Sequence, residues 1–116
     1  MSQRWWLVQT VATPGVDEQS ASGHVEISND VVFDKSLSAT QVVLLALVAS
    51  YGDSKGRSLV SSTMLGDSLS LSSRTIQRHL NVLRDRSLLS WQVVRVSTGS
   101  QRLITVPHSV ARVVYP

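Results

Sequence analysis

Residues Leu65 to Leu80 have the sequence LGDSLSLSSRTIQRHL, which predicts two short helices joined by a tight turn. The apolar residues fall into two clusters, Leu65, Leu69 and Leu71 in the first and Ile76, Leu80 and Leu83 in the second. The second cluster has the i, i+4, i+7 spacing of one helix face. Ser72 is the expected N-cap of the second helix, because its hydroxyl can accept a backbone N–H from the first turn. We expect helices from about Ser61 or Ser62 to Leu69 and from Ser73 to about Arg86.

The opposite face of the second expected helix carries side chains that suit a nucleic acid. They are Ser73, Arg74, Gln77, Arg78, Asn81 and Arg84. Arginine matches the two acceptors of guanine, glutamine and asparagine match the edge of adenine, and arginine also binds phosphates. The nearest acidic residue, Asp85, lies at the far end of the helix. The pattern predicts a helix that lies in the major groove of double-stranded DNA.

This stretch resembles the helix-turn-helix of bacterial winged-helix DNA-binding proteins, a family that includes domains of phage and plasmid replication initiators and small transcription regulators. The resemblance is carried by Leu65, Gly66, Leu69, Ser70, Leu71, Ser72, Thr75, Ile76, Arg78 and Leu80. It runs from about His24 to Val106. The family usually has glycine where this chain has Ser70, so either Ser70 is strained in a left-handed conformation or the turn differs. Gly66 fits the small-residue position where the two helices approach closely.

Length and composition indicate one globular domain. The chain has 116 residues, of which 42% are hydrophobic, and this is enough for a single modest core. No apolar run approaches the roughly 18 residues of a membrane helix. A secretory signal pattern is absent, and the lack of cysteine is compatible with a reducing compartment. We expect a cytoplasmic protein without a membrane partner.

The net charge is only +3, but the charges are unevenly distributed. Residues 1–71 contain four basic and seven acidic residues, a balance of −3. Residues 72–116 contain seven arginines and one acid, a balance of +6, so the two parts together give the +3 of the whole chain. This asymmetry indicates a polyanionic partner. The alternative is a solvated basic face, and the helix-turn-helix pattern favours the partner.

The N-terminal part predicts a strand and a loop. Aromatic and β-branched residues from Trp5 to Val11 are typical of a strand, and small polar residues at 15–23 are typical of a flexible loop. In an extended run the adjacent Trp5 and Trp6 point to opposite sides. Either one packs in the core and the other lies on the surface, or the second contacts a partner subunit.

The next segment predicts a strand, a helical turn and a longer helix. Residues His24 to Ile27 alternate as in a strand, and residues 29–33 suggest a helical turn capped by Asn29. Ser38 and Gln41 have capping-box spacing, which predicts a helix that runs through about Tyr51 and stops at Gly52. Residues 53–58 are expected to form a loop, after which residues 59–60 lead into the next helix.

A β-hairpin is expected after the helix-turn-helix. Residues Gln92 to Val96 and Arg102 to Val106 are two strand-like runs, and residues 97–101 predict a loop slightly longer than the tightest kind. A hairpin at this place in the chain corresponds to the wing of the family. Arg95 and Arg102 flank it, which predicts contact with phosphates or with the minor groove. The alternative is a hairpin that only covers the core.

Residues His108 to Pro116 form an apolar tail, predicted as a strand or a short amphipathic turn. Like the tryptophan-containing start of the chain, this tail has limited room to bury itself in a monomer. Together these segments predict a homodimer, which fits a two-fold symmetric operator with half-sites about one helical turn apart.

Catalytic or metal-binding patterns are missing from the sequence. His24, His79 and His108 are far apart and lack the spacing of metal ligands. His79 is interpreted as a residue at the flank of the second helix or as a phosphate donor. No nucleophile motif of a hydrolase occurs. We expect neither an enzyme nor a cofactor, metal ion or small-molecule ligand.

The expected fold is α+β, a winged helix-turn-helix with a three-helix core, a C-terminal hairpin wing and an additional N-terminal strand. One domain spans residues 1–116, with a strand and loop in 1–23, the core in 24–106 and the tail in 107–116. The expected function is sequence-specific binding of double-stranded DNA by a transcriptional regulator or repressor. By the resemblance, a replication-control protein of a phage or plasmid is the other form of this function. The alternative function is a winged-helix protein–protein interaction module without DNA binding.

Each candidate DNA-binding residue has an expected role. Arg74, Gln77 and Arg78 are expected to read bases, with Asn81 as a further reader. Contacts with the phosphate backbone of the DNA are assigned to Ser72, Ser73, Thr75, Arg84, Arg95 and Arg102. The resemblance places Thr75 near the turn, where its hydroxyl has the alternative role of bracing the two helices.

Overall fold

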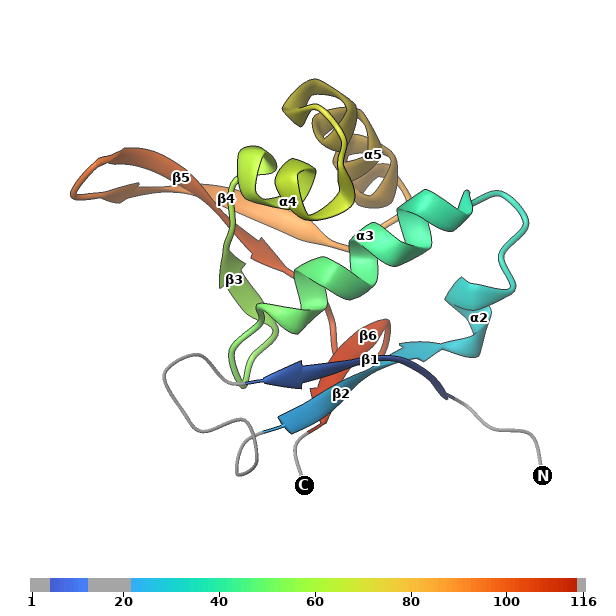
Figure 1. Cartoon of the computed structure of the whole chain (residues 1–116). Helices are drawn as coiled ribbons and strands as arrows, with labels where there is room; N and C mark the ends of the chain where they lie inside the picture. The colour runs from blue at the N-terminus through green and yellow to red at the C-terminus, as the bar shows by residue number, and fades with distance from the viewer. Residues whose placement is uncertain (1–4, 13–21, 115–116) are drawn as a thin grey trace.

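The computed structural model describes residues 5–12 and 22–114, which contain four helices and six strands (Figure 1). In chain order these are β1 (Trp5–Ala12), β2 (Ser22–Ser28), α2 (Asn29–Val32), α3 (Ala39–Ser50), β3 (Arg57–Leu59), α4 (Ser62–Leu69), α5 (Ser73–Asp85), β4 (Ser90–Val96), β5 (Gly99–Thr105) and β6 (Ala111–Val114). The α+β class expected from the sequence is confirmed. Most of the expected loop at 15–23, the side chains of Trp5 and Trp6 and the last two residues of the tail lie outside the part described.

The strands form two antiparallel sheets of three strands each. One sheet has the order β1-β2-β6 and the other has the order β3-β5-β4. Figure 1 shows α3 lying between the β1-β2-β6 sheet on one side and helices α4 and α5 on the other. The hairpin of β4 and β5 projects beyond α4. No helix in the described ranges has the length and apolar character needed to cross a bilayer.

Helix α3 forms the centre of the molecule. Its N-terminus has the predicted capping box: Ser38 Oγ accepts the Gln41 backbone N–H at 3.1 Å, and the Gln41 side chain accepts the Ser38 backbone N–H at 2.9 Å. The helix ends at Ser50 with Tyr51 as its C-cap, close to the expected end. Leu44, Leu45 and Val48 are completely buried because the helix has packed layers on both sides.

Helices α4 and α5 lie close to the expected positions, and α5 has the predicted Ser72 cap. Ser61 Oγ accepts the Met64 N–H at 3.1 Å, and Ser72 Oγ accepts the Thr75 N–H at 3.1 Å. The second predicted apolar cluster is fully buried, since Ile76, Leu80 and Leu83 are each 0% exposed. The first cluster has Leu65 fully buried, while its other two leucines are half-buried against the core.

The turn between α4 and α5 contains a left-handed residue that is not glycine. Ser70 has φ 57° and ψ 41°. Of the two alternatives expected from the sequence, a strained left-handed Ser70 or a different turn, the first is therefore the one that occurs. The Leu71 N–H then donates to the Gly66 carbonyl at 2.9 Å. A Cβ atom on Gly66 would meet the Leu71 carbonyl oxygen at 2.4 Å, which confirms that this position requires a small residue.

Two local expectations about the elements before α4 are wrong. Helix α2 is capped by Ser28, whose Oγ accepts the Asp30 N–H, so Asn29 is the first helical residue. Residues 57–59 form strand β3, although they were expected to end a loop and lead into a helix. Three residues are too few to show an alternating pattern, and this strand exists because Leu59 pairs with Leu103 on β5.

The hairpin turn is tighter than the sequence predicts. Val96 pairs with Gly99, so only two residues connect β4 and β5. Ser100 and Gln101 belong to β5, but both are exposed, and their polar side chains resemble a loop in sequence. Gly99 has φ 131°, a conformation that favours glycine.

The C-terminal tail forms an edge strand of the β1-β2-β6 sheet within the monomer. Strand β6 pairs with β2 over residues 111–114, and Ala111 is 1% exposed. Val110 and Val113 pack against the core. The interpretation that this tail has limited room to bury itself in a monomer is therefore wrong for the described residues up to Val114.

Candidate nucleic-acid interface

The outer face of α5 carries the residues expected to read DNA bases. Arg74 and Arg78 are exposed and lie one turn apart on the side opposite the buried Ile76 and Leu80. Asn81 continues this row and is half-buried. The face ends with an exposed acid, Asp85, in the last turn. Two helical turns of α5 therefore present a continuous surface of cations and amides.

Gln77 and Asn81 are joined on this surface. Gln77 Nε2 donates to Asn81 Oδ1 at 3.0 Å. This hydrogen bond orients both amides and directs the carbonyl oxygen of Gln77 and the amide nitrogen of Asn81 toward other partners. An acceptor and a donor placed together match the pattern that adenine presents in the major groove.

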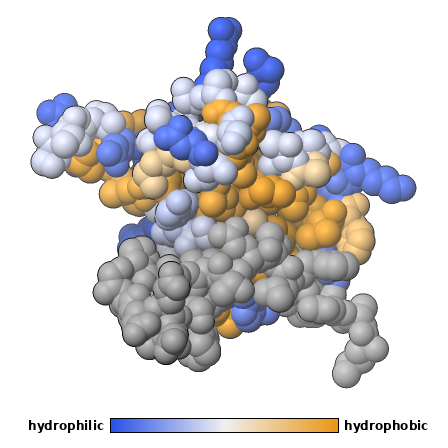
Figure 2. Space-filling model, in the orientation of Figure 1, coloured by the Kyte–Doolittle hydropathy of each residue, from blue (hydrophilic) through white to orange (hydrophobic). Residues whose placement is uncertain are grey.

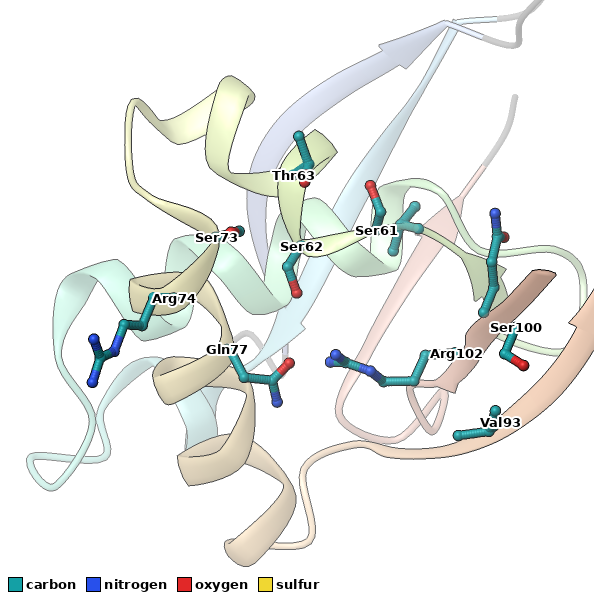
Figure 3. Close-up of a pocket in the computed structure, with 11 residues that line it drawn as sticks. Ser61, Ser62, Thr63, Ser73, Arg74, Gln77, Val93, Ser100 and Arg102 are labelled. Carbon is teal, nitrogen blue, oxygen red and sulfur yellow. The ribbon is translucent and has the colours of Figure 1, made fainter. Parts of the chain in front are cut away.

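A groove of about 600 Å³ lies between the starts of α4 and α5 and the hairpin (Figure 3). Figure 3 shows Arg102 reaching from β5 toward Gln77 on α5, whereas Arg74 points away along the outer side of α5. The groove is lined by hydroxyl, amide and guanidinium groups and by two valines, and it has no carboxylate. Its lining residues are Val60, Ser61, Ser62, Thr63, Ser73, Arg74, Gln77, Val93, Ser100, Gln101 and Arg102.

The hairpin places both of its arginines on one face. Arg95 is paired with Ser100, and Val93 is paired with Arg102. Directly opposite residues share a face, and so do residues two apart along a strand. Arg95 and Arg102 therefore lie on the face that borders the groove. Arg95 is exposed and Arg102 is half-buried.

Trp91 on β4 contacts two of the predicted backbone-binding residues. The guanidinium carbon of Arg84 lies 4.4 Å from the centroid of the Trp91 ring, and that of Arg102 lies 5.1 Å from it. Both are within the range of a cation–π contact. Sequence reasoning missed this role of Trp91. The available signal was the alternation of Trp91, Val93 and Arg95, which places them on one face of the strand.

The hydroxyls at the start of α5 interact with each other. Ser72 Oγ accepts the Thr75 N–H and donates to Thr75 Oγ1 at 2.9 Å. Thr75 is half-buried, and its hydroxyl contacts the N-cap residue of its own helix. Ser73 is exposed and lines the groove, where its hydroxyl is accessible to a ligand.

His79 lies on the other flank of α5 and connects it to α3. Its Nδ1 is 3.2 Å from Gln41 Nε2. The amide nitrogen of glutamine is a donor, so Nδ1 accepts this hydrogen bond. The same Gln41 side chain completes the capping box of α3, and His79 therefore fixes α5 against the start of the central helix.

Five of the seven arginines in the basic half of the chain lie on α5 or on the hairpin. Arg86 instead donates to Ser36, and Arg112 pairs with Glu26 at 3.0 Å on the β1-β2-β6 sheet. A hydrogen bond from His24, with a further contribution from Arg112, lowers the pKa of Glu26 from its ordinary value of 4.5. Figure 2 shows hydrophilic side chains projecting from the region of α5 and from the end of the hairpin, with apolar side chains over α3.

Comparisons with protein-family models, with curated proteins and with solved structures found no match to this chain. Its function is therefore inferred from its own residues and their geometry.

Proposed function

We propose that this protein is a winged helix-turn-helix protein that binds double-stranded DNA in a sequence-selective way. The observation that carries this proposal is the meeting of two arginine-bearing surfaces, the outer face of α5 and one face of the β4–β5 hairpin, at a groove without a carboxylate. The positive charge and the polar side chains of this surface suit the phosphate backbone of a duplex. In this proposal α5 lies in the major groove and the hairpin is the wing.

The side chains divide into two roles in the proposed complex. Arg74, Gln77 and Arg78 read base edges, and Asn81 acts together with Gln77 because their amides are hydrogen-bonded. Arg84, Arg95 and Arg102 bind phosphates and set the position of the protein on the duplex. Ser72 and Thr75 stabilise the start of α5 through their hydrogen bonds, and Ser73 in the groove contacts the DNA backbone. Backbone N–H groups at the start of α5 also favour an anion.

The biological role that follows is control of transcription or of replication. A repressor and a replication-control protein of a phage or plasmid need the same thing from this domain, which is occupancy of a defined DNA site. The position of the preferred sequence relative to a promoter or a replication origin distinguishes the two roles.

We further propose that the protein binds DNA as a homodimer. Strand β1 is at the edge of its sheet among the described strands, so one side of it is available to a second copy. A two-fold dimer would place its two copies of α5 on half-sites about one helical turn apart. A monomeric mass in light scattering at micromolar protein, both without and with DNA, would contradict this part of the proposal.

The experiment that tests the DNA proposal is selection from a pool of randomised duplexes, followed by sequencing and by a salt titration on the enriched duplex. We expect an enriched motif and an affinity that falls steeply with salt. Salt-sensitive binding without enrichment would contradict sequence selectivity. Absence of binding at low salt would overturn the DNA function and would favour a protein partner on the same basic surface.

A further inference from the structure

The side chain of Trp91, on strand β4 of the hairpin, contacts one arginine from the end of α5 and one from β5. Arg84 comes from the last turn of α5 and Arg102 comes from β5, and both guanidinium groups lie over the ring of Trp91 on β4 at 4.4 Å and 5.1 Å. The ring is half-buried and packs against the hydrophobic core. Three elements therefore converge on one fixed aromatic surface. We call Arg84 and Arg102 the arginine pair.

We propose that Trp91 is a positioning residue, which holds the arginine pair ready to bind neighbouring phosphates of one DNA strand. This inference rests on the proposed DNA function. Helix and wing would then engage the backbone together, because both cations are fixed by the same ring.

The electrostatics of the arginine pair favour an anionic partner. Within the described chain no carboxylate forms an ion pair with Arg102. Arg84 is paired with Asp85, but its Nε lies 3.8 Å from Asp85 Oδ1, which is a long separation for an ion pair. Two cations near one ring repel each other, and a phosphate between or beside them relieves this repulsion. The arrangement is therefore stabilised by the ligand.

Preorganisation explains why an aromatic residue is useful at this place. A free arginine side chain loses much rotamer freedom when it binds a phosphate. Contact with the indole restricts the guanidinium before binding, so part of this loss has already occurred in the free protein. Arg102 borders the groove and points toward Gln77, which places its charge next to the base-reading surface (Figure 3).

A purely structural role for Trp91 makes a different prediction. If the ring only attached the hairpin to α5, its loss would lower thermal stability equally whether or not the arginine pair is present. A positioning residue acts through the arginines. Its loss therefore lowers DNA affinity only when they are present, and it does not change the number of phosphates contacted.

The test uses the full chain with Trp91→Met, which removes the ring, and Trp91→Phe, which keeps an aromatic face. We expect W91M to weaken binding to the enriched duplex about three- to tenfold, and W91F to stay within about twofold of the wild type. The slope of log affinity against log salt should remain unchanged in both. By contrast, R84A and R102A should each reduce that slope by about 1. Val94→Ala, on the opposite face of the same strand, is the matched control.

Two further measurements separate the possible outcomes. In an R84A/R102A background, W91M should cause no additional loss of affinity. Without DNA, the Nε–H signals of Arg84 and Arg102 should show an aromatic ring-current shift in the wild type that disappears in W91M. Should W91M fail to fold by circular dichroism, the affinities of R84A, R102A and the double variant replace it, and additive losses would overturn the inference.

The proposed function and this inference fail in different ways. If the wild type binds no duplex at low salt, the DNA function is overturned and the role of Trp91 falls with it. If the wild type binds and W91M binds equally well, or if W91M still weakens the R84A/R102A variant, only the role of Trp91 is overturned.

Discussion

The backbone of Gly66 is in direct contact with the carbonyl oxygen of Leu71, because a Cβ atom on Gly66 would lie 2.4 Å from that oxygen. The Leu71 N–H also donates to the Gly66 carbonyl at 2.9 Å. Helix α4 and the turn that follows it are therefore packed backbone against backbone. This contact determines the direction in which α5 leaves the turn, and hence the orientation of the proposed DNA-binding surface.

Replacement of Gly66 by alanine should distort this turn. The added methyl group meets backbone atoms that cannot move aside without shifting α5, so we expect a loss of about 1–3 kcal/mol or more in the free energy of unfolding. Chemical denaturation followed by circular dichroism measures this loss. Ser68→Ala, at an exposed position of the same helix, is the control and should stay within about 0.5 kcal/mol of the wild type.

Replacement of Ser70 by glycine should have the opposite effect. Ser70 has a left-handed conformation that glycine adopts without steric strain. We expect S70G to raise the free energy of unfolding by about 0.5–1 kcal/mol, since relief of strain exceeds the extra freedom that glycine gives the unfolded chain. Ser68→Gly, in the last turn of α4, should lower it by about 0.5 kcal/mol. Lower stability of S70G would contradict the conformation of this turn.

The helices could be predicted from sequence because their signals are local. Ser38 and Gln41 are three residues apart, and Ser72 directly precedes the spaced apolar residues of α5, so each helix start is encoded in a few neighbouring positions. Strand β3 could not be predicted in this way. Its three residues are ordered by a partner strand more than 40 positions away, with Leu59 opposite Leu103.

The candidate site also has one part that local sequence signals predict and another part that they do not. The row of Arg74, Arg78 and Asn81 follows from helical periodicity alone. The contact of Trp91 with the two arginines depends on how the hairpin packs against α5, which no spacing along the chain encodes. The hairpin loop was predicted to be too long for a related reason. Ser100 and Gln101 are exposed and polar, so no apolar residue in the sequence marks them as part of a strand.

Gln41 stabilises both α3 and its contact with α5. Its side chain accepts the Ser38 N–H at 2.9 Å and donates to His79 at 3.2 Å while it is itself buried. Loss of both hydrogen bonds in Gln41→Ala should lower the free energy of unfolding by about 1–3 kcal/mol. Thr40→Ala, next to it and exposed, should change stability by no more than about 0.5 kcal/mol. Equal stability of the two variants would contradict the importance of this network.

The stability of the loop before β3 should depend on pH through Asp53. Backbone N–H groups of Arg57 and Lys55 donate to its carboxylate and lower its pKa in the folded protein from the ordinary value of 3.8. A lowered folded-state pKa means that the contribution to stability is fully present above pH 3.8 and is lost as the pH falls through the folded pKa.

Asp53→Asn tests this dependence, because asparagine keeps an oxygen that accepts the same backbone hydrogen bonds but lacks the charge. The wild type should be more stable than D53N at neutral pH, and the difference should shrink below pH 3.8. Denaturation midpoints measured across this range provide the comparison. A difference that stays constant down to the acid end would show that the charge is not the cause.

Arg78 and Arg95 should affect DNA binding in different ways, because they lie on different parts of the proposed interface. Arg78→Ala removes a proposed base-reading group, so affinity for the preferred duplex should fall by about 1–3 kcal/mol and sequence preference should relax at one position. Arg95→Ala removes a proposed phosphate contact. It should weaken binding to all duplexes uniformly and reduce the salt slope by about 1.

The control is Arg112→Gln, which removes one positive charge on the β1-β2-β6 sheet across α3 from the interface and should leave sequence preference unchanged (Figure 1). If R78A kept its full affinity and sequence preference, the outer face of α5 would not be the surface that reads DNA.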